Sequence, residues 1–102
     1  MTDAEIIQMF WRREETAITE TQTRYGTYCT HIAMNILSDR EDAEECVSDT
    51  WLQAWNTIPP QKPRSLRAYL GRIVRNLSLN RWNHDHAQKR YSGMEQLLSE
   101  LE

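Results

Sequence analysis

Residues 42–55 read DAEECVSDTWLQAW, and the spacing of the apolar side chains in this stretch indicates a helix. The apolar positions recur every three or four residues, which places them on one side of a helix that packs against a core. We therefore expect a helix over about residues 41–57, with Ser38 or Asp39 as its N-cap. Its buried stripe is predicted to consist of Ala43, Cys46, Val47, Thr50, Trp51, Ala54 and Ile58.

Helical periodicity also continues on both sides of this stretch. It predicts a short helix that begins near Thr2 or Asp3 and a longer helix over about residues 14–37. A last helix is expected over about residues 66–82, with Ser65 as its N-cap. Because 102 residues are enough for one domain, the sequence predicts an all-α fold, a compact bundle of about four helices.

Two segments are expected to lie outside these helices. Residues 59–63 hold three prolines, and each proline restricts its own backbone and that of the residue before it, so this connection should be extended. Residues 94–102 form a short amphipathic segment that is more typical of a linker than of a core.

The composition excludes several classes of protein. With 39% hydrophobic and 26% charged residues, the chain is neither collagen-like nor wholly disordered. No apolar run is long enough to cross a bilayer, so no membrane association is expected. Cys29 and Cys46 fall within predicted helices and form no regular framework, which favours reduced core thiols and a cytoplasmic location.

Motifs for catalysis or metal binding are missing from the sequence. It contains no glycine-rich phosphate loop, no nucleophile elbow and no zinc-protease motif. The cysteines and histidines that could bind zinc are not spaced as in any structural zinc site. We therefore expect a protein that is not an enzyme and that holds no metal and no cofactor. The candidate ligands considered for zinc are Cys29, His31, Cys46, His84 and His86.

The charges are divided between two parts of the chain. Residues 1–58 carry eleven acidic and four basic side chains, whereas residues 59–93 carry one acidic and eight basic side chains. Such an asymmetry indicates two different partners, and the basic part is compatible with a polyanion as one of them.

A second face of the helix over residues 41–57 carries acidic and polar residues. With the apolar stripe turned inward, Glu45, Ser48, Asp49 and Leu52 line up at helical spacing. Two interpretations stay open: an ordinary solvated face with one exposed leucine, or a docking surface for a basic helix with Leu52 as its anchor.

Basic and amide side chains gather on the last helix, opposite its core stripe. Arginines on one face next to aromatic residues can hold phosphates and stack bases, and a proline-rich loop beside them can form a pocket for an unstacked base. The alternative is a solvated basic face. The residues concerned are Arg72, Arg75, Asn76, Leu79 and Asn83, with Lys62, Arg64 and Arg67 in and beside the loop.

These residues resemble a known family. Residues 42–55 resemble the D-A-E-D-x-V-Q-x-x-F-L-x-A-W signature of bacterial RNA polymerase sigma factors. Residues 66–76, followed by Asn80 and Arg81, resemble the W-L-x-x-I-A-x-N-x-x-x-D-x-x-R stretch of the same family. The resemblance covers about residues 3–90 and is closest to region two of the extracytoplasmic-function class.

The resemblance implies a four-helix domain without catalysis that binds two partners. The acidic helix would dock on the clamp helices of the largest subunit of the RNA polymerase core, through Glu44, Glu45, Ser48, Asp49 and Leu52. The loop and last helix would recognise and melt the minus-ten promoter element, and trap a flipped base of the non-template single strand. The implied DNA-binding residues are Lys62, Arg64, Ser65, Arg67, Arg72, Arg75, Asn76, Asn80 and Arg81.

The chain departs from the family pattern in several places. Ser48 replaces a glutamine, Tyr69 stands where tryptophan is common, and Asn80 stands where aspartate is common. The family usually has a second, helix-turn-helix domain, so residues 1–92 are the predicted domain and residues 93–102 the expected start of a linker to a second domain that the chain lacks.

The sequence leaves a further partner and other functional classes open. An anti-sigma factor is a further candidate partner. A small helical protein–protein adaptor is the main alternative function, and it would not need the basic loop and helix. A regulator that reads double-stranded DNA fits less well, because no short glycine-containing turn joins two helices.

Overall fold

The described part of the chain folds into four helices. A computed structural model describes residues 1–101, with side chains described for residues 1–86. No strand occurs in the described range, so the predicted all-α fold is confirmed. The helices are α1 (Asp3–Trp11), α2 (Thr16–Leu37), α3 (Arg40–Thr57) and α4 (Leu66–Leu101).

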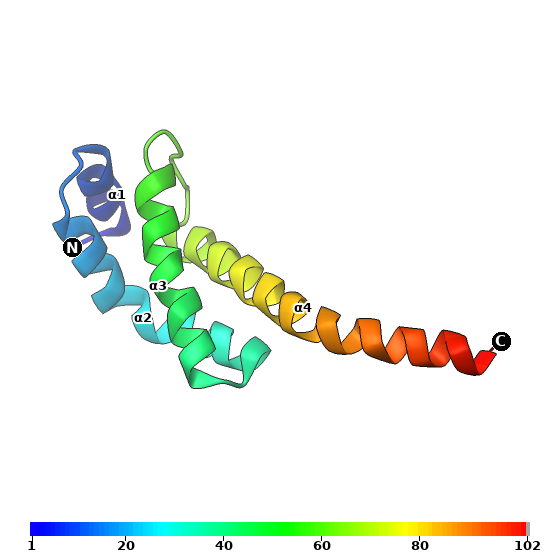
Figure 1. The fold of residues 1–102 in the computed structure, drawn as a ribbon. Helices are drawn as coiled ribbons and strands as arrows, with labels where there is room; N and C mark the ends of the chain where they lie inside the picture. The colour runs from blue at the N-terminus through cyan, green and yellow to red at the C-terminus, as the bar shows by residue number, and fades with distance from the viewer. Residues whose placement is uncertain (102) are drawn as a thin grey trace.

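Buried apolar side chains from all four helices form one core, and Figure 1 shows how the helices are arranged. α2 packs against both α3 and α4, α3 packs against α4, and α1 covers one end of α2. The helix faces that the apolar periodicity predicts to be buried supply this core, because burying them removes apolar surface from water. Trp11, the last residue of α1, lies four positions after the buried Ile7 and continues the apolar spacing of this helix, but it is 44% exposed. The fully buried side chains include Ile6, Phe10, Cys29, Ile58, Leu66, Leu70 and Val74.

Side-chain caps begin three of the helices, as expected. The Thr2 hydroxyl, the Asp39 carboxylate and the Ser65 hydroxyl each accept a hydrogen bond from the backbone N–H three residues later, at 3.2, 3.0 and 3.2 Å. Each bond satisfies a donor that the first turn of a helix leaves without a partner. Ser38 instead ends α2, in the left-handed conformation with φ 62°.

α4 is longer than the sequence pattern predicts. The apolar stripe indicates a helix that ends near Trp82, but α4 continues to Leu101 and leaves the bundle (Figure 1). Residues 83–93 are mostly polar and contain no proline, so the pattern gives no apolar stripe although nothing in the backbone stops the helix. The projecting part of α4 makes the molecule 61 Å long and at most 25 Å across.

The connection between α3 and α4, residues 58–65, is the linker of this fold. It is not extended throughout, because the Gln61 N–H donates a hydrogen bond of 2.8 Å to the Thr57 carbonyl and closes a turn. The linker lies beside α1 at one end of the bundle (Figure 1).

α2 and α4 approach each other closely at Gly71. A Cβ atom placed there would lie 2.6 Å from the hydroxyl oxygen of Tyr28 on α2, well inside van der Waals contact. The Tyr28 ring is covered on one face by the guanidinium of Arg67, whose Cζ lies 4.2 Å from the ring centre. The absence of a side chain at Gly71 therefore sets how near α4 lies to α2.

We expect Gly71→Ala to lower the free energy of unfolding, measured by urea denaturation. The added methyl group would meet the Tyr28 hydroxyl, and overpacking of this kind costs about 1–3 kcal/mol. That cost outweighs or cancels the gain of about 1 kcal/mol from replacing glycine inside a helix. Tyr28→Phe removes the oxygen, so the double variant should recover the helical gain.

Gly26→Ala on α2 is the matched control for this prediction. A Cβ atom at Gly26 would meet nothing within 4 Å, so the substitution should stabilise the protein by about 1 kcal/mol. If Gly71→Ala stabilised the protein as much as Gly26→Ala does, the close approach of the two helices would be wrong.

Candidate functional site

The acidic face of α3 is open to solvent. Because α3 turns its apolar stripe toward α2 and α4, all five residues predicted on the other face are exposed. Leu52 is 58% exposed and is one of three exposed large hydrophobic residues in the described part of the chain, with Met1 and Trp11. We call this surface the docking face; it consists of Glu44, Glu45, Ser48, Asp49 and Leu52.

Arg81 connects α4 to the start of α3. Its guanidinium lies 2.8 Å from the Asp42 carboxylate, 3.3 Å from that of Glu45 and 3.5 Å from that of Asp85. The negative charges of Asp42 and Glu45 raise the pKa of Arg81. Arg81 was predicted to bind DNA, but in the structure its charge is shared among carboxylates of the protein itself.

An open pocket of about 260 Å³ lies where the linker meets α4. Two arginine side chains and the ring of Tyr69 surround it, so it offers positive charge beside an aromatic wall. Three of the predicted DNA-binding residues, Arg64, Ser65 and Arg72, come together here. We call it the loop pocket; its lining residues are Pro63, Arg64, Ser65, Ala68, Tyr69 and Arg72.

Tyr69 is held in place by the end of α3. Its hydroxyl lies 2.6 Å from the Thr57 hydroxyl, which itself donates a 2.8 Å hydrogen bond to the Gln53 carbonyl. Because the proton of Thr57 is used in that bond, the Tyr69 hydroxyl is the donor to Thr57. The tyrosine that replaces the common tryptophan thus fastens a wall of the loop pocket to α3.

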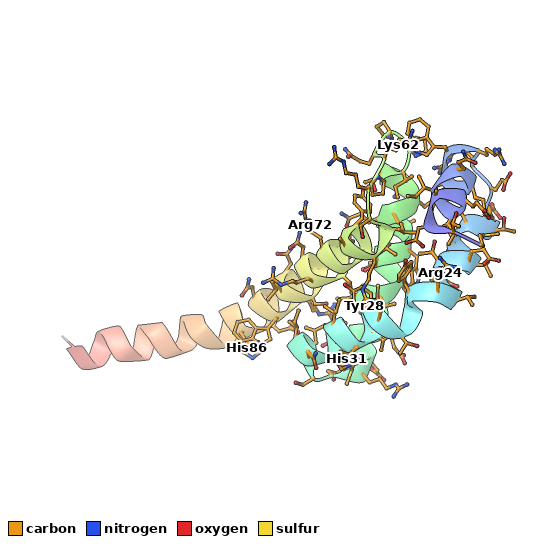
Figure 2. The ribbon with its side chains drawn as sticks, turned by 180° about the vertical axis from the view of Figure 1, so that it is seen from behind. Arg24, Tyr28, His31, Lys62, Arg72 and His86 are labelled. Carbon is orange, nitrogen blue, oxygen red and sulfur yellow. The ribbon has the colours of Figure 1, made fainter. Side chains whose placement is uncertain are left out.

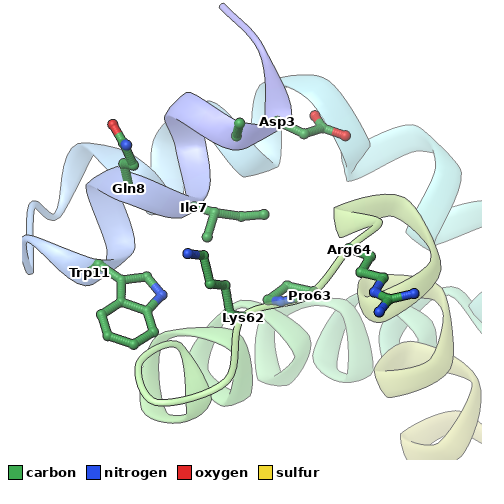
Figure 3. A pocket seen from close by; sticks show the side chains of 8 residues that line it. Asp3, Ile7, Gln8, Trp11, Lys62, Pro63 and Arg64 are labelled. Carbon is green, nitrogen blue, oxygen red and sulfur yellow. The ribbon is translucent and has the colours of Figure 1, made fainter.

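Lys62 lies apart from the loop pocket. Figure 3 shows its side chain in a second hollow, of about 540 Å³, between α1 and the linker and close to Ile7 and Trp11. Pro63 and Arg64 line both hollows and therefore form the wall between them. The tertiary structure thus separates Lys62 from Arg72, as Figure 2 also shows.

The remaining predicted residues are distributed along α4. Arg67 covers Tyr28, on the side of α4 that faces α2. Arg75, Asn76 and Asn80 are exposed further along the helix. Arg72, Arg75, Asn76 and Asn80 follow one another at three- and four-residue spacing, so they continue from the loop pocket along the exposed side of α4, whereas Lys62 and Arg67 lie elsewhere.

Arg13, to which the sequence pattern assigns no role, connects the turn after α1 to the end of α3. Its Nη1 donates hydrogen bonds of 2.8 and 2.9 Å to the carbonyls of Trp55 and Ile58 at the end of α3. Its guanidinium carbon also lies 3.6 Å from the centre of the Trp55 ring. In the sequence Arg13 is visible only as a charge that interrupts an apolar pattern, so no local signal points to these contacts.

The two cysteines are free and buried. Burial raises the pKa of Cys29 to about 11, so this thiol is protonated and unreactive at neutral pH. Among the described residues, no three potential metal ligands gather in one place. No described helix is long and apolar enough to span a membrane.

The comparison with protein families identifies what these surfaces belong to. Residues 22–87, more than half of the chain, match the family described as Sigma-70 region 2. Comparisons with curated proteins and with solved structures gave no match. The matched segment contains most of α2, all of α3, the linker and the bundled part of α4, and hence both the docking face and the loop pocket. The chain therefore belongs to the sigma-70 region 2 family, the part of a sigma factor that binds RNA polymerase and melts promoter DNA when transcription begins.

Proposed function

We propose that the chain is the region 2 domain of a sigma factor of the extracytoplasmic-function class. It acts in the bacterial cytoplasm without catalysis of its own, and it joins the polymerase to the minus-ten promoter element. The observation that carries the proposal is the loop pocket. Two arginines and the Tyr69 ring line it at the start of α4, and Tyr69 joins it to the end of α3, the helix with the docking face.

The docking face is suited to a basic helical partner, and we propose the clamp helices of the largest polymerase subunit. An exposed leucine surrounded by carboxylates offers an apolar anchor within a charged rim. Acidic residues steer a basic surface toward the contact, and burial of Leu52 supplies apolar contact area once it forms.

The loop pocket is suited to an unstacked base of the non-template strand. Removing a base from the stack costs a few kcal/mol, which contacts in the pocket must offset. The Tyr69 ring offers a surface for stacking, and Arg64 and Arg72 can neutralise the adjoining phosphates. Ser65 caps α4 at the rim of the pocket and so fixes where the helix begins.

The other predicted residues would contact the same strand outside the pocket. We propose this role for Lys62, Arg67, Arg75, Asn76 and Asn80. Arg81 can take part only by exchanging its carboxylate partners for a phosphate.

Two further proposals concern domain organisation and regulation. Residues 1–92 form the domain, and residues 93–102 begin the connection to a second domain, distinct from the linker between α3 and α4. An anti-sigma factor is a further partner.

We expect Arg72→Ala to weaken binding to a labelled A/T-rich single strand and to flatten the dependence of the affinity on salt. Loss of one phosphate contact should reduce the slope of log K against log salt by about 0.7. Fluorescence titrations at several salt concentrations, with single- and double-stranded forms of the oligonucleotide, measure both effects.

Arg40→Ala is the control for Arg72→Ala, because Arg40 lies at the start of α3, on an exposed i,i+4 pair with Glu44. It removes the same charge and should leave the slope unchanged. Equal slopes for Arg72→Ala and the parent would remove Arg72 from the phosphate contacts. If the unchanged chain neither preferred single strands nor responded to salt, a protein–protein adaptor would be favoured.

We expect Leu52→Glu to abolish binding to the polymerase clamp helices and to leave the fold intact, because an exposed side chain contributes little to the core. A pull-down with a clamp-helix fragment measures binding, and circular dichroism checks the fold. Gln53→Glu is the control: it adds the same charge at the next exposed position without removing the leucine. Unchanged binding by Leu52→Glu would contradict the assignment of the docking face.

A further inference from the structure

The last turn of α3 lacks the backbone donors that a continuing helix would supply. In a helix the Trp55 carbonyl would accept a hydrogen bond from the N–H of residue 59, but Pro59 has no N–H. Arg13 replaces that donor: its Nη1 binds the carbonyls of both Trp55 and Ile58. A positively charged donor at the C-terminus of a helix also interacts favourably with the negative end of the helix dipole.

The turn that carries Arg13 is closely defined. Arg13 has φ 58°, in the left-handed region that favours glycine. Its N–H donates to the Phe10 carbonyl, and the N–H of Glu14 donates to the Met9 carbonyl, both at 3.0 Å. An arginine therefore occupies a backbone position that suits glycine better, and the contacts of its side chain supply a physical reason.

Those contacts lie where the linker starts. Ile58 is the residue at which the chain leaves α3, and its carbonyl is held by Arg13. At the preceding residue, Thr57 receives the hydrogen bond from Tyr69, which lines the loop pocket. The end of α3 is thus held from the α1–α2 turn on one side and from α4 on the other.

We infer that Arg13 is a positioning residue for base capture: it does not touch DNA, but it sets the path of the linker so that Pro63, Arg64 and Ser65 form their side of the loop pocket. This inference rests on the proposed function of that pocket. It predicts that loss of the Arg13 side chain impairs recognition of the captured base, moves Arg64 from its place at the pocket, and leaves the Arg72 phosphate contact and the docking face unaffected.

The test uses the full chain and a set of A/T-rich single strands, each with one abasic site at a different position. In the unchanged chain, the abasic site that weakens binding most marks the captured base. We expect Arg13→Gly to reduce this loss of affinity at the abasic site about tenfold. The salt slope should change by no more than about 0.7, the share of the single Arg64 contact, and binding to the clamp helices should not change. Glycine is chosen because it favours the left-handed turn and removes only the side chain.

Two further variants separate the role of the guanidinium from that of charge. Arg13→Lys keeps a charged donor without the planar guanidinium. The loss of affinity caused by the abasic site should then lie between that of Arg13→Gly and that of the parent. Arg12→Ala removes one positive charge at the exposed neighbouring position and should behave as the parent.

Each other outcome overturns a defined part of the scheme. If Arg13→Gly kept the full penalty while the parent showed one, the positioning role would be wrong and base capture would stand. If Arg13→Gly weakened every oligonucleotide and the clamp helices by the same factor, Arg13 would only stabilise the fold. If no abasic site affected the parent, base capture itself would fail, and the role of Arg13 with it.

Discussion

The geometry of the loop pocket depends on which donors form hydrogen bonds with the backbone carbonyls at the end of α3. Two prolines follow Ile58, so the final carbonyls of the helix cannot all be paired by the backbone that comes after them. Arg13 and the Gln61 N–H supply donors there, and Tyr69 binds the Thr57 hydroxyl beside them. The linker therefore leaves the bundle from a point that α1, α3 and α4 determine together.

This arrangement places two surfaces of opposite charge on two helices, α3 and α4, that pack against each other. The docking face lies along α3, and the loop pocket lies between the end of the linker and the start of α4. Arg81 joins the same two helices further along, through its ion pairs with Asp42 and Glu45. A protein that must hold a polymerase and a DNA strand in a fixed relation needs a joint of this kind, since flexibility between the surfaces would add an entropic cost to binding.

Much of the fold can be predicted from the sequence because the signals involved are local. Apolar periodicity and capping residues act over three or four positions, and they are enough to indicate four helices and the exposure of Leu52. The same reasoning fails where it has no local signal. Residues 83–93 lack an apolar stripe, and the turn at Gln61 depends on a hydrogen bond to Thr57 within a proline-rich segment that suggests extended chain.

Apart from the extension of α4 beyond Trp82, the helices, three of their N-caps and the separation of acidic from basic residues follow from the amino-acid sequence alone, because each depends on residues that are neighbours along the chain. Which basic residues share a pocket depends instead on how the helices pack. Packing brings Arg64 and Arg72 together, sets Lys62 on the other side of Pro63, and uses Arg81 within the protein. It also pairs Arg13 with Trp55, 42 positions away, a contact that exists only because the folded bundle brings distant backbone groups within hydrogen-bonding reach.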